Sequence, residues 1–333
     1  LRQGLENTVS NTWTKPLTQV RSVPDRAEVA PVASTASARK RRRFMIGVLS
    51  IARLMLTCKD APASVTVQVC GSNSMPGVRD KTALVTGCGS AGGIGFACAK
   101  LLAAAGARVA ITSTTDRIHE RARELGAGVF AHPCDLSDAT QVDHLVTATE
   151  AALGPIDIVV NNAGMVQIGH DEPSRLIQDI PDEQWRRGMD INLTTVFYVT
   201  RRVVPSMIKR KYGRIVNMSS VTGPLVSNPR GTIYSAAKAA IMGMTRAQAI
   251  ELAPYNITVN GIGPGWIETP SSSPEEVFAG TQAPVGRPGT PDEIGQVALF
   301  LASEEASFVT GQLIVADGGN TLMEYKGPAE GYY

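Results

Sequence analysis

A repeated alternation of two kinds of segment limits the folds open to this chain. From residue 81 onward, short β-branched and apolar runs alternate with longer amphipathic stretches. This is the pattern of repeated βαβ units, which form a parallel sheet with helices on both faces. The runs at 83–85 and 158–160 are continuously apolar, as strands covered on two sides are. The sequence therefore predicts a doubly wound α/β fold with one seven-stranded parallel sheet in a single domain.

The expected elements follow from these patterns. We expect strands at 81–86, 108–112, 128–132, 157–160, 214–218, 257–260 and 313–315. We expect helices at 94–105, 116–125, 138–152, 182–210, 233–252 and 291–302. Ser137 and Thr290 are the candidate N-caps, because a short hydroxyl side chain accepts hydrogen bonds from free N–H groups at a helix start.

The composition excludes several other classes of protein. With 43% hydrophobic residues among 333, the chain can bury a full-sized core and is not disordered throughout. No apolar run is long enough to span a membrane. The five Cys are widely spaced without a C-x-x-C pair and there are only four His, so neither a disulfide framework nor a metal site is indicated. We expect a reducing, cytoplasmic compartment.

Charge divides the chain unevenly. Residues 1–79 hold 12 Lys and Arg against 4 acidic residues, whereas residues 80–333 hold 20 against 26. The basic run 39–43 followed by the apolar run 44–51 has the order of a targeting signal, but it begins far from the first residue and Arg53 follows it closely. A nucleic-acid partner would need this basic segment to be exposed, and we regard that interpretation as the weaker one.

Three interpretations of residues 1–74 stay open. They are a transit-type leader, which would move the protein to an organelle matrix; an arm that binds nucleic acid or a membrane surface; and sequence upstream of the natural start. We favour the last, because a start at Met75 leaves a length typical of one domain. We therefore expect a disordered extension over 1–74 and the folded domain over 75–333.

A glycine-rich loop joins the first expected strand to the first expected helix. Glycines let a backbone approach a pyrophosphate closely, and the free N–H groups and dipole of the helix stabilise its charge. A plain tight turn is the alternative for such a cluster. The loop predicts a dinucleotide site, with these candidate contacts: Gly87, Gly89, Gly93, Ile94 and Gly95.

The end of the second strand predicts which dinucleotide binds. An NAD site usually has an acidic residue there, which binds the ribose 2′-hydroxyl. Here the strand ends in Ser113 and Thr114, with Arg117 nearby, which leaves room for a 2′-phosphate. We expect Asp116 to cap the following helix. The sequence favours NADP, with NAD as the alternative.

Tyr234 and Lys238 lie four residues apart, on one face of an expected helix. A cation beside a phenol lowers its pKa toward neutral pH, which suits a proton donor to a carbonyl oxygen. A surface pair without function has the same spacing. The spacing alone does not distinguish the two interpretations; the other motifs of the chain favour the functional one.

Further motifs occur in a fixed order along the chain: Cys134–Asp135–Leu136, Asn161–Asn162–Ala163–Gly164, Asn192, Met218–Ser219–Ser220, residues 264–269, and Asp317–Gly318–Gly319. With these motifs, residues 81 to about 320 resemble the short-chain dehydrogenase/reductase family, and within it the reductases of 3-oxoacyl thioesters on acyl carrier protein. The resemblance implies a Rossmann sheet and a pyridine-nucleotide cofactor.

The resemblance also implies the roles of particular residues. The catalytic tetrad would be Asn192, Ser220, Tyr234 and Lys238. Tyr234 would protonate the carbonyl, Ser220 would hydrogen-bond the same oxygen, Lys238 would also bind the nicotinamide ribose, and Asn192 would hold a water molecule. The remaining cofactor contacts would be Asp135, Leu136, Asn161, Ala163, Gly164, Pro264, Gly265, Ile267 and Thr269.

The expected activity is hydride transfer from NADPH to a carbonyl, with a small substrate carried on acyl carrier protein or coenzyme A. A general alcohol, sugar or steroid dehydrogenase using NAD is the alternative enzyme. An inactive dinucleotide-binding sensor or scaffold is the alternative from another class. The resemblance further implies a homotetramer, in which the helices 182–210 and 233–252 pair across a two-fold axis.

Four features depart from the family pattern or stay ambiguous. The glycine loop is two residues longer than usual, and the interval from Ser220 to Tyr234 is one residue longer. The segment 270–286, which would close over the substrate, is short and rich in Ser and Pro. The fourth feature is the set of basic residues that could contact an acidic carrier protein or form a solvated helix end: Lys209, Arg210, Lys211 and Arg214.

Overall fold

The computed structural model describes residues 77–164 and 173–323. These residues belong to one compact unit, Val69–Tyr333. The extension expected over 1–74 and the boundary expected at Met75 lie outside the described residues. No helix within the described ranges combines the length and the apolar character needed to cross a membrane.

Seven parallel strands form one sheet in the order β3-β2-β1-β4-β5-β6-β7. The strands are β1 (Thr82–Thr86), β2 (Arg108–Ser113), β3 (Phe130–Pro133), β4 (Ile158–Asn161), β5 (Gly213–Met218), β6 (Ile257–Pro264) and β7 (Leu313–Ala316). This confirms the doubly wound Rossmann-type sheet. Because the chain order reverses between β1 and β4, a crevice for ligands forms at the carboxyl ends of these two strands.

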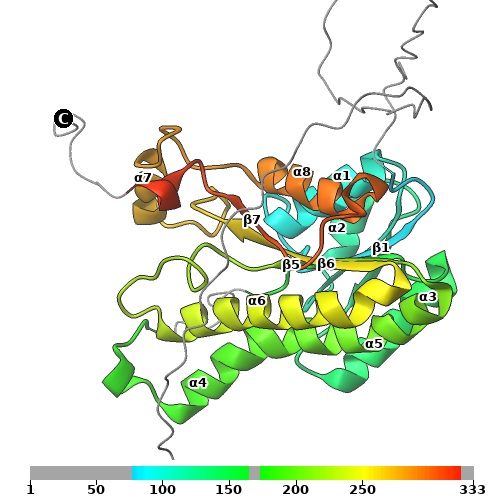
Figure 1. Ribbon diagram of the computed structural model, residues 1–333, viewed down its shortest axis with the longest axis horizontal. Helices are drawn as coiled ribbons and strands as arrows, with labels where there is room; N and C mark the ends of the chain where they lie inside the picture. Colours follow the sequence, from blue (N-terminus) through cyan, green and yellow to red (C-terminus); the bar gives the residue numbers. More distant parts are fainter. Residues whose placement is uncertain (1–76, 165–172, 324–333) are drawn as a thin grey trace, which may run out of the picture. The chain divides into compact units, whose positions relative to one another are not determined.

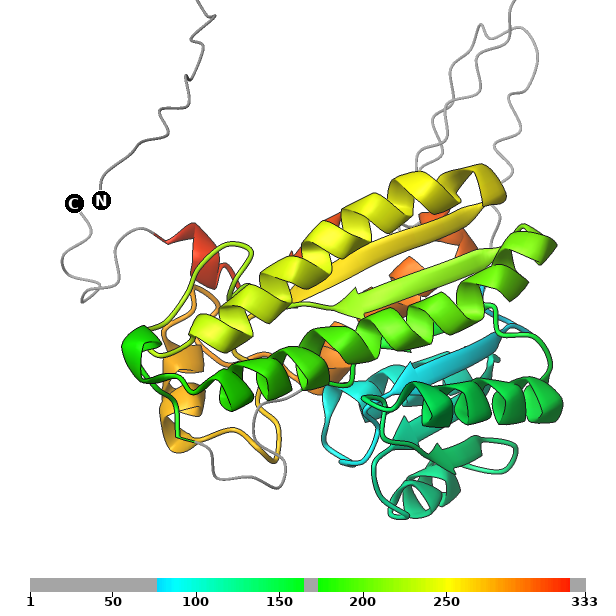
Figure 2. The ribbon, with the colours of Figure 1, turned by 90° about the horizontal axis from the view of Figure 1, so that it is seen from below.

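Helices cover both faces of the sheet (Figure 1). They are α1 (Ile94–Ala104), α2 (Ile118–Leu125), α3 (Ala139–Leu153), α4 (Asp182–Met189), α5 (Thr195–Arg210), α6 (Thr232–Leu252), α7 (Pro274–Thr281) and α8 (Pro291–Ala302). Figure 2 looks onto the face that α3, α5 and α6 cover. Val85 and Val216 enter a core with α1, α2 and α8, whereas their neighbours Leu84 and Ile215 enter a second core with α3, α5 and α6.

The helix expected over 182–210 is not continuous. It consists of α4, a π-helical turn over Asp190–Thr194, and α5. The amide Nδ2 of Asn192, inside this turn, donates to the carbonyl of Gly188 at 3.0 Å. In a π turn the backbone hydrogen bonds span five residues, one more than in an α-helix, so the turn is wider. Single π turns inside α-helices are often found at functional sites. Helical periodicity alone does not reveal such a turn.

Two expected caps are wrong. Asp138, not Ser137, caps α3, because its carboxylate accepts from the N–H of Thr140 at 2.8 Å, while the Ser137 hydroxyl donates to Asp135 at 2.7 Å. Asp116 does not cap α2, whose N-cap position is Arg117, without a side-chain cap. In both cases a neighbouring residue occupies the position that the sequence assigned to the cap.

Helix α7 lies in the segment expected to be a Ser/Pro-rich loop. It begins with a capping box, in which Ser273 accepts from the N–H of Glu276 and Glu276 accepts from the N–H of Ser273. Thr290 and Glu293 form the same box at α8, which confirms Thr290 as an N-cap. The Ser-Pro-Glu-Glu sequence at 273–276 is the signal that would have predicted α7.

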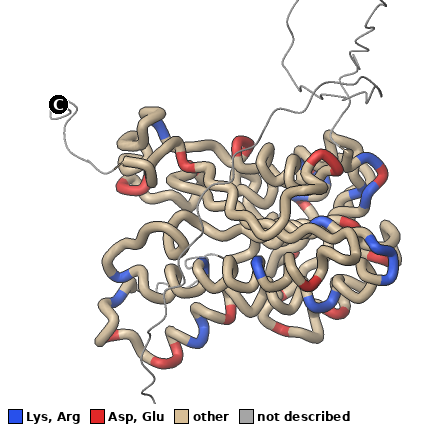
Figure 3. The backbone as a smooth tube through the Cα atoms, in the orientation of Figure 1, with Lys and Arg blue, Asp and Glu red and all other residues tan. Residues whose placement is uncertain are grey.

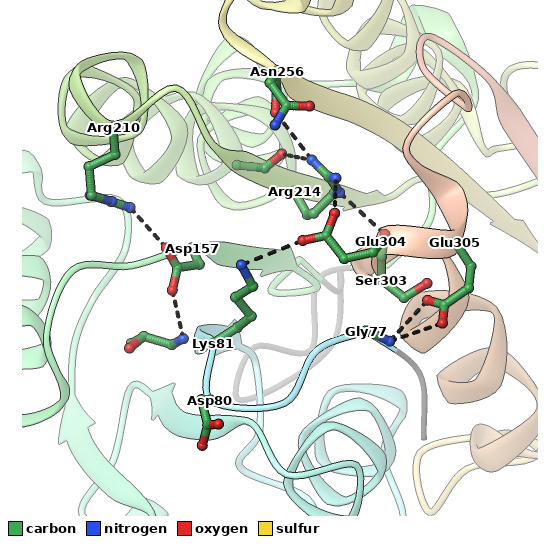
Figure 4. A network of polar contacts seen from close by, with 12 residues as sticks. Gly77, Asp80, Lys81, Asp157, Arg210, Arg214, Asn256, Ser303, Glu304 and Glu305 are labelled. Carbon is green, nitrogen blue, oxygen red and sulfur yellow. Dashed lines mark hydrogen bonds and ion pairs between the residues drawn. The ribbon is translucent and has the colours of Figure 1, made fainter. Parts of the chain in front are cut away.

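A polar network lies at the amino ends of the strands (Figure 4). Its centre is Arg214, which is fully buried and donates to the backbone carbonyls of Ser303 and Asn256 and to the carboxylate of Glu304. Lys81 also pairs with Glu304, at 3.5 Å. The network connects the first residues of the domain to β5 and to the end of α8.

This network changes the interpretation of the basic residues at 209–214. Arg214 is internal and Arg210 pairs with Asp157 at 3.3 Å, so only Lys209 and Lys211 are exposed. Basic and acidic positions are intermixed around the described backbone (Figure 3). The set lies where β5 begins, and Ser220 follows the opposite end of that strand. Lys209 and Lys211 therefore form the expected solvated end of α5, whereas Arg214 belongs to the interior.

Candidate active site

Three side chains meet beyond the carboxyl end of β5. Ser220 follows the strand directly, and Tyr234 and Lys238 lie on the first turns of α6. The Ser220 hydroxyl lies close enough to the Tyr234 phenol to lower its pKa. The Lys238 ammonium lies 5.5 Å from the centre of the Tyr234 ring and donates to the carbonyl of Met218 at 2.9 Å. A hydroxyl pair backed by a cation is thus held on a strand end and a helix start.

The structure places Ser220, and not Ser219, beside the phenol. The Ser219 hydroxyl is buried and donates to the carbonyl of Lys238 at 2.9 Å, so it supports the helix backbone. The Ser220 hydroxyl accepts from the N–H of Thr222 at 3.0 Å. That bond uses an acceptor site of Ser220 and leaves its hydroxyl proton free to be donated.

Burial sets the ionisation of this cluster. Desolvation raises the pKa of Tyr234, and the hydrogen bond from Ser220 opposes that rise only in part. Desolvation also lowers the pKa of Lys238 to about 8. The expected lowering of the phenol pKa by the neighbouring cation is therefore wrong, because burial dominates and raises this pKa. Tyr234 is a neutral phenol at neutral pH, which is the state of a proton donor.

Asn192 lies at the inner end of the site. Its side chain is fully buried, and its Oδ1 has no hydrogen-bond partner among the described residues. This oxygen lies 3.2 Å from the point that a Cβ atom on Gly164 would occupy. An unpartnered buried acceptor costs about 1–3 kcal/mol, unless water or a ligand donates to it. The π turn therefore presents a polar atom that needs a donor.

The glycine loop packs against the end of β4. Gly87 has φ +72°, and a Cβ atom there would lie 2.9 Å from the backbone of Ala163. Asn162, part of the motif that the resemblance places at the ribose, donates from Nδ2 to the carbonyls of Thr86 and Gly87, both at 3.2 Å. Its side chain therefore supports the backbone of the glycine loop.

The end of β2 carries a basic side chain. A Cβ atom on Gly89 would lie 3.1 Å from Cβ of Ser113 and 3.6 Å from Nη2 of Arg117. Thr114 beside them is exposed. The guanidinium thus lies beside the glycine loop, at the strand end where a dinucleotide places its adenosine ribose.

Other candidates have structural partners. The Asn161 side chain is buried; its Nδ2 donates to Thr200 at 3.1 Å and to Asn217 at 2.9 Å, while its Oδ1 has no hydrogen-bond partner among the described residues. Asp135 accepts from the N–H and hydroxyl of Ser137. Leu136 is buried beneath this turn. The structure keeps these residues at the strand ends but turns the Asn161 side chain inward.

The segment after β6 forms a tight series of turns. A Cβ atom on Gly265 would lie 2.6 Å from Cβ of Asp317, so the Asp-Gly-Gly motif packs directly against it. Ile267 pairs with Gly289 as an isolated bridge. The Thr269 hydroxyl lies 3.0 Å from Ser271 Oγ. Pro264, Gly265, Ile267 and Thr269 thus lie in one segment that leaves the carboxyl edge of the sheet.

These residues fit a dinucleotide. The first turn of α1 follows Gly93 with no side-chain cap and no acidic residue, so its N–H groups are available to an anion. The unpartnered Oδ1 of Asn192 lies beside Gly164, which follows β4. A cavity of about 600 Å³ lies beside the loop tip, between α1, the start of α8 and Thr269; Tyr234 and Ser220 are not part of its lining. The glycine loop follows β1 and Ser220 follows β5, so both lie at the carboxyl edge of the parallel sheet.

The sheet, the crevice and this cluster define a dinucleotide-dependent oxidoreductase. Residues 87–321 match the family model described as enoyl-(acyl carrier protein) reductase. The chain belongs to the short-chain dehydrogenase/reductase family, and it is an NAD(P)-dependent dehydrogenase or reductase.

Characterised relatives cover the described domain. Oxidoreductase UcpA of Salmonella typhimurium is 40% identical over 261 residues, covering 73% of this chain and 95% of that protein. The 3-oxoacyl-[acyl-carrier-protein] reductase FabG of Thermotoga maritima is 41% identical over 250 residues, covering 73% and 98%. A crystal structure of a putative gluconate dehydrogenase from Agrobacterium tumefaciens is 32% identical, with a TM-score of 0.68, over 74% of this chain and 98% of that one.

Proposed function

We propose that this chain reduces the 3-oxo group of acyl thioesters with NADPH, the acyl chain being carried on acyl carrier protein or coenzyme A. The observation that carries the proposal is the meeting of three side chains: Tyr234, Ser220 beside it, and Lys238, whose ammonium lies 5.5 Å from the centre of the phenol ring. The similarity to the FabG reductase supports the substrate class.

Each residue of the tetrad has a role in this proposal. When bound, the reduced nicotinamide supplies the hydride. Tyr234 donates its phenolic proton to the carbonyl oxygen, and Ser220 hydrogen-bonds the same oxygen as negative charge develops on it. Lys238 stabilises the phenolate that remains and binds the nicotinamide ribose. Asn192 offers Oδ1 to a water molecule that returns a proton to the site.

Arg117 supports NADP as the cofactor. Its guanidinium lies beside Ser113 and Gly89, without a carboxylate at the end of β2 that would bind a ribose 2′-hydroxyl. A guanidinium forms paired hydrogen bonds to a phosphate. We therefore propose that Arg117 and the hydroxyls of Ser113 and Thr114 bind the 2′-phosphate.

The assembly and location belong to the same proposal. We place α5 and α6 at the two-fold interfaces of a homotetramer. Cys88, Cys98 and Cys134 are free and buried thiols, as expected in a reducing compartment, and this supports a cytoplasmic location.

A second candidate function is a general alcohol or sugar dehydrogenase that uses NAD. The 37% identity to the D-beta-hydroxybutyrate dehydrogenase of Cupriavidus necator, over 262 residues, supports it, as does the gluconate dehydrogenase fold. A sensor or scaffold without activity has less support, because all four tetrad side chains are present.

A spectrophotometric assay of cofactor oxidation tests the proposal. Acetoacetyl-coenzyme A and an acetoacetyl carrier-protein thioester are offered with NADPH and with NADH, beside simple ketones, ketosugars and ketosteroids. We expect turnover of the thioesters, with NADPH preferred by at least about tenfold in kcat/KM. If the enzyme turns over sugars or simple ketones with NADH and does not turn over thioesters, the proposed function is wrong and the second candidate function is supported.

A further inference from the structure

The additional residues of the glycine loop make a contact outside the phosphate site. The tip of the loop is a turn closed by the N–H of Gly93, which donates to the carbonyl of Ser90 at 3.1 Å. Gly92, at this tip, lies against the ring of Pro270. A Cβ atom on Gly92 would lie 2.8 Å from Cγ and 2.9 Å from Cδ of Pro270. Such distances are too short for two carbon atoms, so only a glycine fits against the ring.

Pro270 belongs to the segment 267–272, whose backbone conformation is fixed by several hydrogen bonds. The N–H of Ser272 donates to the carbonyl of Thr269 at 2.9 Å, and the Ser272 hydroxyl donates to the carbonyl of Ile267 at 3.1 Å. The N–H of Glu268 donates to the carbonyl of Gly289 at 2.9 Å. These bonds tie residues 267–272 into one turn. A displacement of Pro270 would therefore also displace Thr269.

We infer that the loop tip is a positioning element, in which Gly92 holds Pro270 and thereby fixes the distance between the phosphate-binding loop and Thr269. The inference rests on the proposed function, in which Thr269 binds the nicotinamide carboxamide. The two ends of the dinucleotide then contact segments that also contact each other. A shorter glycine loop, lacking the additional residues, would not carry this contact.

The contact also adjoins free space. Gly92 and Pro270 line the cavity of about 600 Å³ together with residues of α1 and of the start of α8. A larger side chain at position 92 can therefore displace the turn without overpacking a closed core. The consequence is a shift of Thr269 in a folded protein, which binding measurements can detect.

The test is the substitution Gly92→Ala, with two probes titrated by fluorescence and calorimetry. NADPH contacts both ends of the site, whereas 2′-phospho-ADP-ribose lacks the nicotinamide. We expect the Kd of NADPH to rise about tenfold and that of 2′-phospho-ADP-ribose to change by less than about twofold, within the range of coupling between residues in contact. The control is Gly243→Ala in α6, where a Cβ atom meets nothing of this chain within 4 Å; because α6 also lies in the proposed interface, the mass of this variant is measured by light scattering alongside.

Rescue separates positioning from general damage. Pro270→Ala removes the ring atoms that would clash with the methyl group of Gly92→Ala. The double variant should therefore bind NADPH with a Kd within about twofold of that of Pro270→Ala alone. Unchanged NADPH binding by Gly92→Ala, equal weakening of both probes, or no rescue would overturn the inference while leaving the function in place. A wild-type chain that binds no NADPH would overturn the proposed function, and the inference with it.

Discussion

Burial shifts the pKa values of Lys238 and Tyr234 in opposite directions. Lys238 is only 2% exposed, and the desolvation that lowers its pKa also raises that of Tyr234. The spacing of the pair is visible in the sequence. The net direction of the phenol pKa is not, because it depends on how much of the site β5 and α6 exclude from water.

Removal of the phenol hydroxyl tests its role as the proton donor. Tyr234→Phe keeps the ring and its packing but leaves no acid at the carbonyl oxygen. We expect kcat to fall by about 10²–10⁴-fold, the usual contribution of a positioned acid. NADPH affinity, measured by fluorescence, should stay within about threefold of wild type. Turnover that survives this substitution would contradict the proposed mechanism and favour another donor.

Activity should also fall at alkaline pH through Lys238. The pKa of Lys238 is lowered from 10.5 to about 8, so its ammonium loses a proton as the pH rises through that value. We expect kcat/KM for NADPH, which reports the free enzyme, to fall up to about tenfold per pH unit above about pH 8. A flat profile up to about pH 9.5 would contradict the assignment.

The same titration has the opposite effect on stability. Between about pH 8 and 10.5 the unfolded Lys238 binds a proton and the folded one does not, so this residue makes the free energy of unfolding rise with pH. Its protonated, buried form destabilises the fold below about pH 8. Loss of activity without a fall in thermal midpoint would therefore separate titration from unfolding.

At the scale of elements, local patterns located every strand and most helices, and the errors have local causes. The ends of β1 to β7 were expected within a few residues because apolar runs between polar turns define them. The π turn in 190–194 was missed because its wider backbone leaves the apolar spacing nearly unchanged. Helix α7 was missed because Ser and Pro at its start were interpreted as loop residues, although both are common in a capped first turn.

The network around Arg214 joins elements that are far apart in the chain, and its loss should be costly. Arg214→Ala leaves the carbonyls of Ser303 and Asn256 without this donor, while Glu304 keeps Lys81 as a partner. We expect the free energy of unfolding, from urea denaturation, to fall by about 3 kcal/mol, because the substitution leaves buried carbonyls unsatisfied and a cavity where the side chain was.

An exposed ion pair provides the control for that measurement. Arg287 pairs with Glu293 at 2.7 Å, with both side chains about half exposed. Arg287→Ala should lower the free energy of unfolding by no more than about 1 kcal/mol. Equal losses in the two variants would show that burial of Arg214 contributes nothing to stability.

At the scale of the whole molecule, the proposed assembly can be measured directly. Phe197 on α5 is 41% exposed and Ile250 on α6 is 79% exposed, so these helices present apolar surface that a second copy could cover. Light scattering should give about four times the chain mass of 35.2 kDa. A strict monomer would contradict the tetramer.

A charge placed on α5 should break one of the two-fold contacts. Phe197→Glu would put a carboxylate into the proposed interface, and we expect the mass to fall to about half of that of the tetramer. Phe278→Glu on α7 is the matched control, because Phe278 is 67% exposed but lies outside α5 and α6. A tetramer retained by the Phe197 variant would place the contact elsewhere.

The sequence by itself determined the parallel sheet, the glycine loop at the end of β1, and the spacing of Tyr234 and Lys238, because periodicity and spacing are properties of neighbouring residues. Only the tertiary structure decided that Asn161 turns inward, that Arg214 is buried, and that Gly92 meets Pro270. Each of these depends on segments that are distant along the chain and meet only when the sheet has formed. The directions of the pKa shifts were also decided only by the tertiary structure, since burial is a property of the folded molecule.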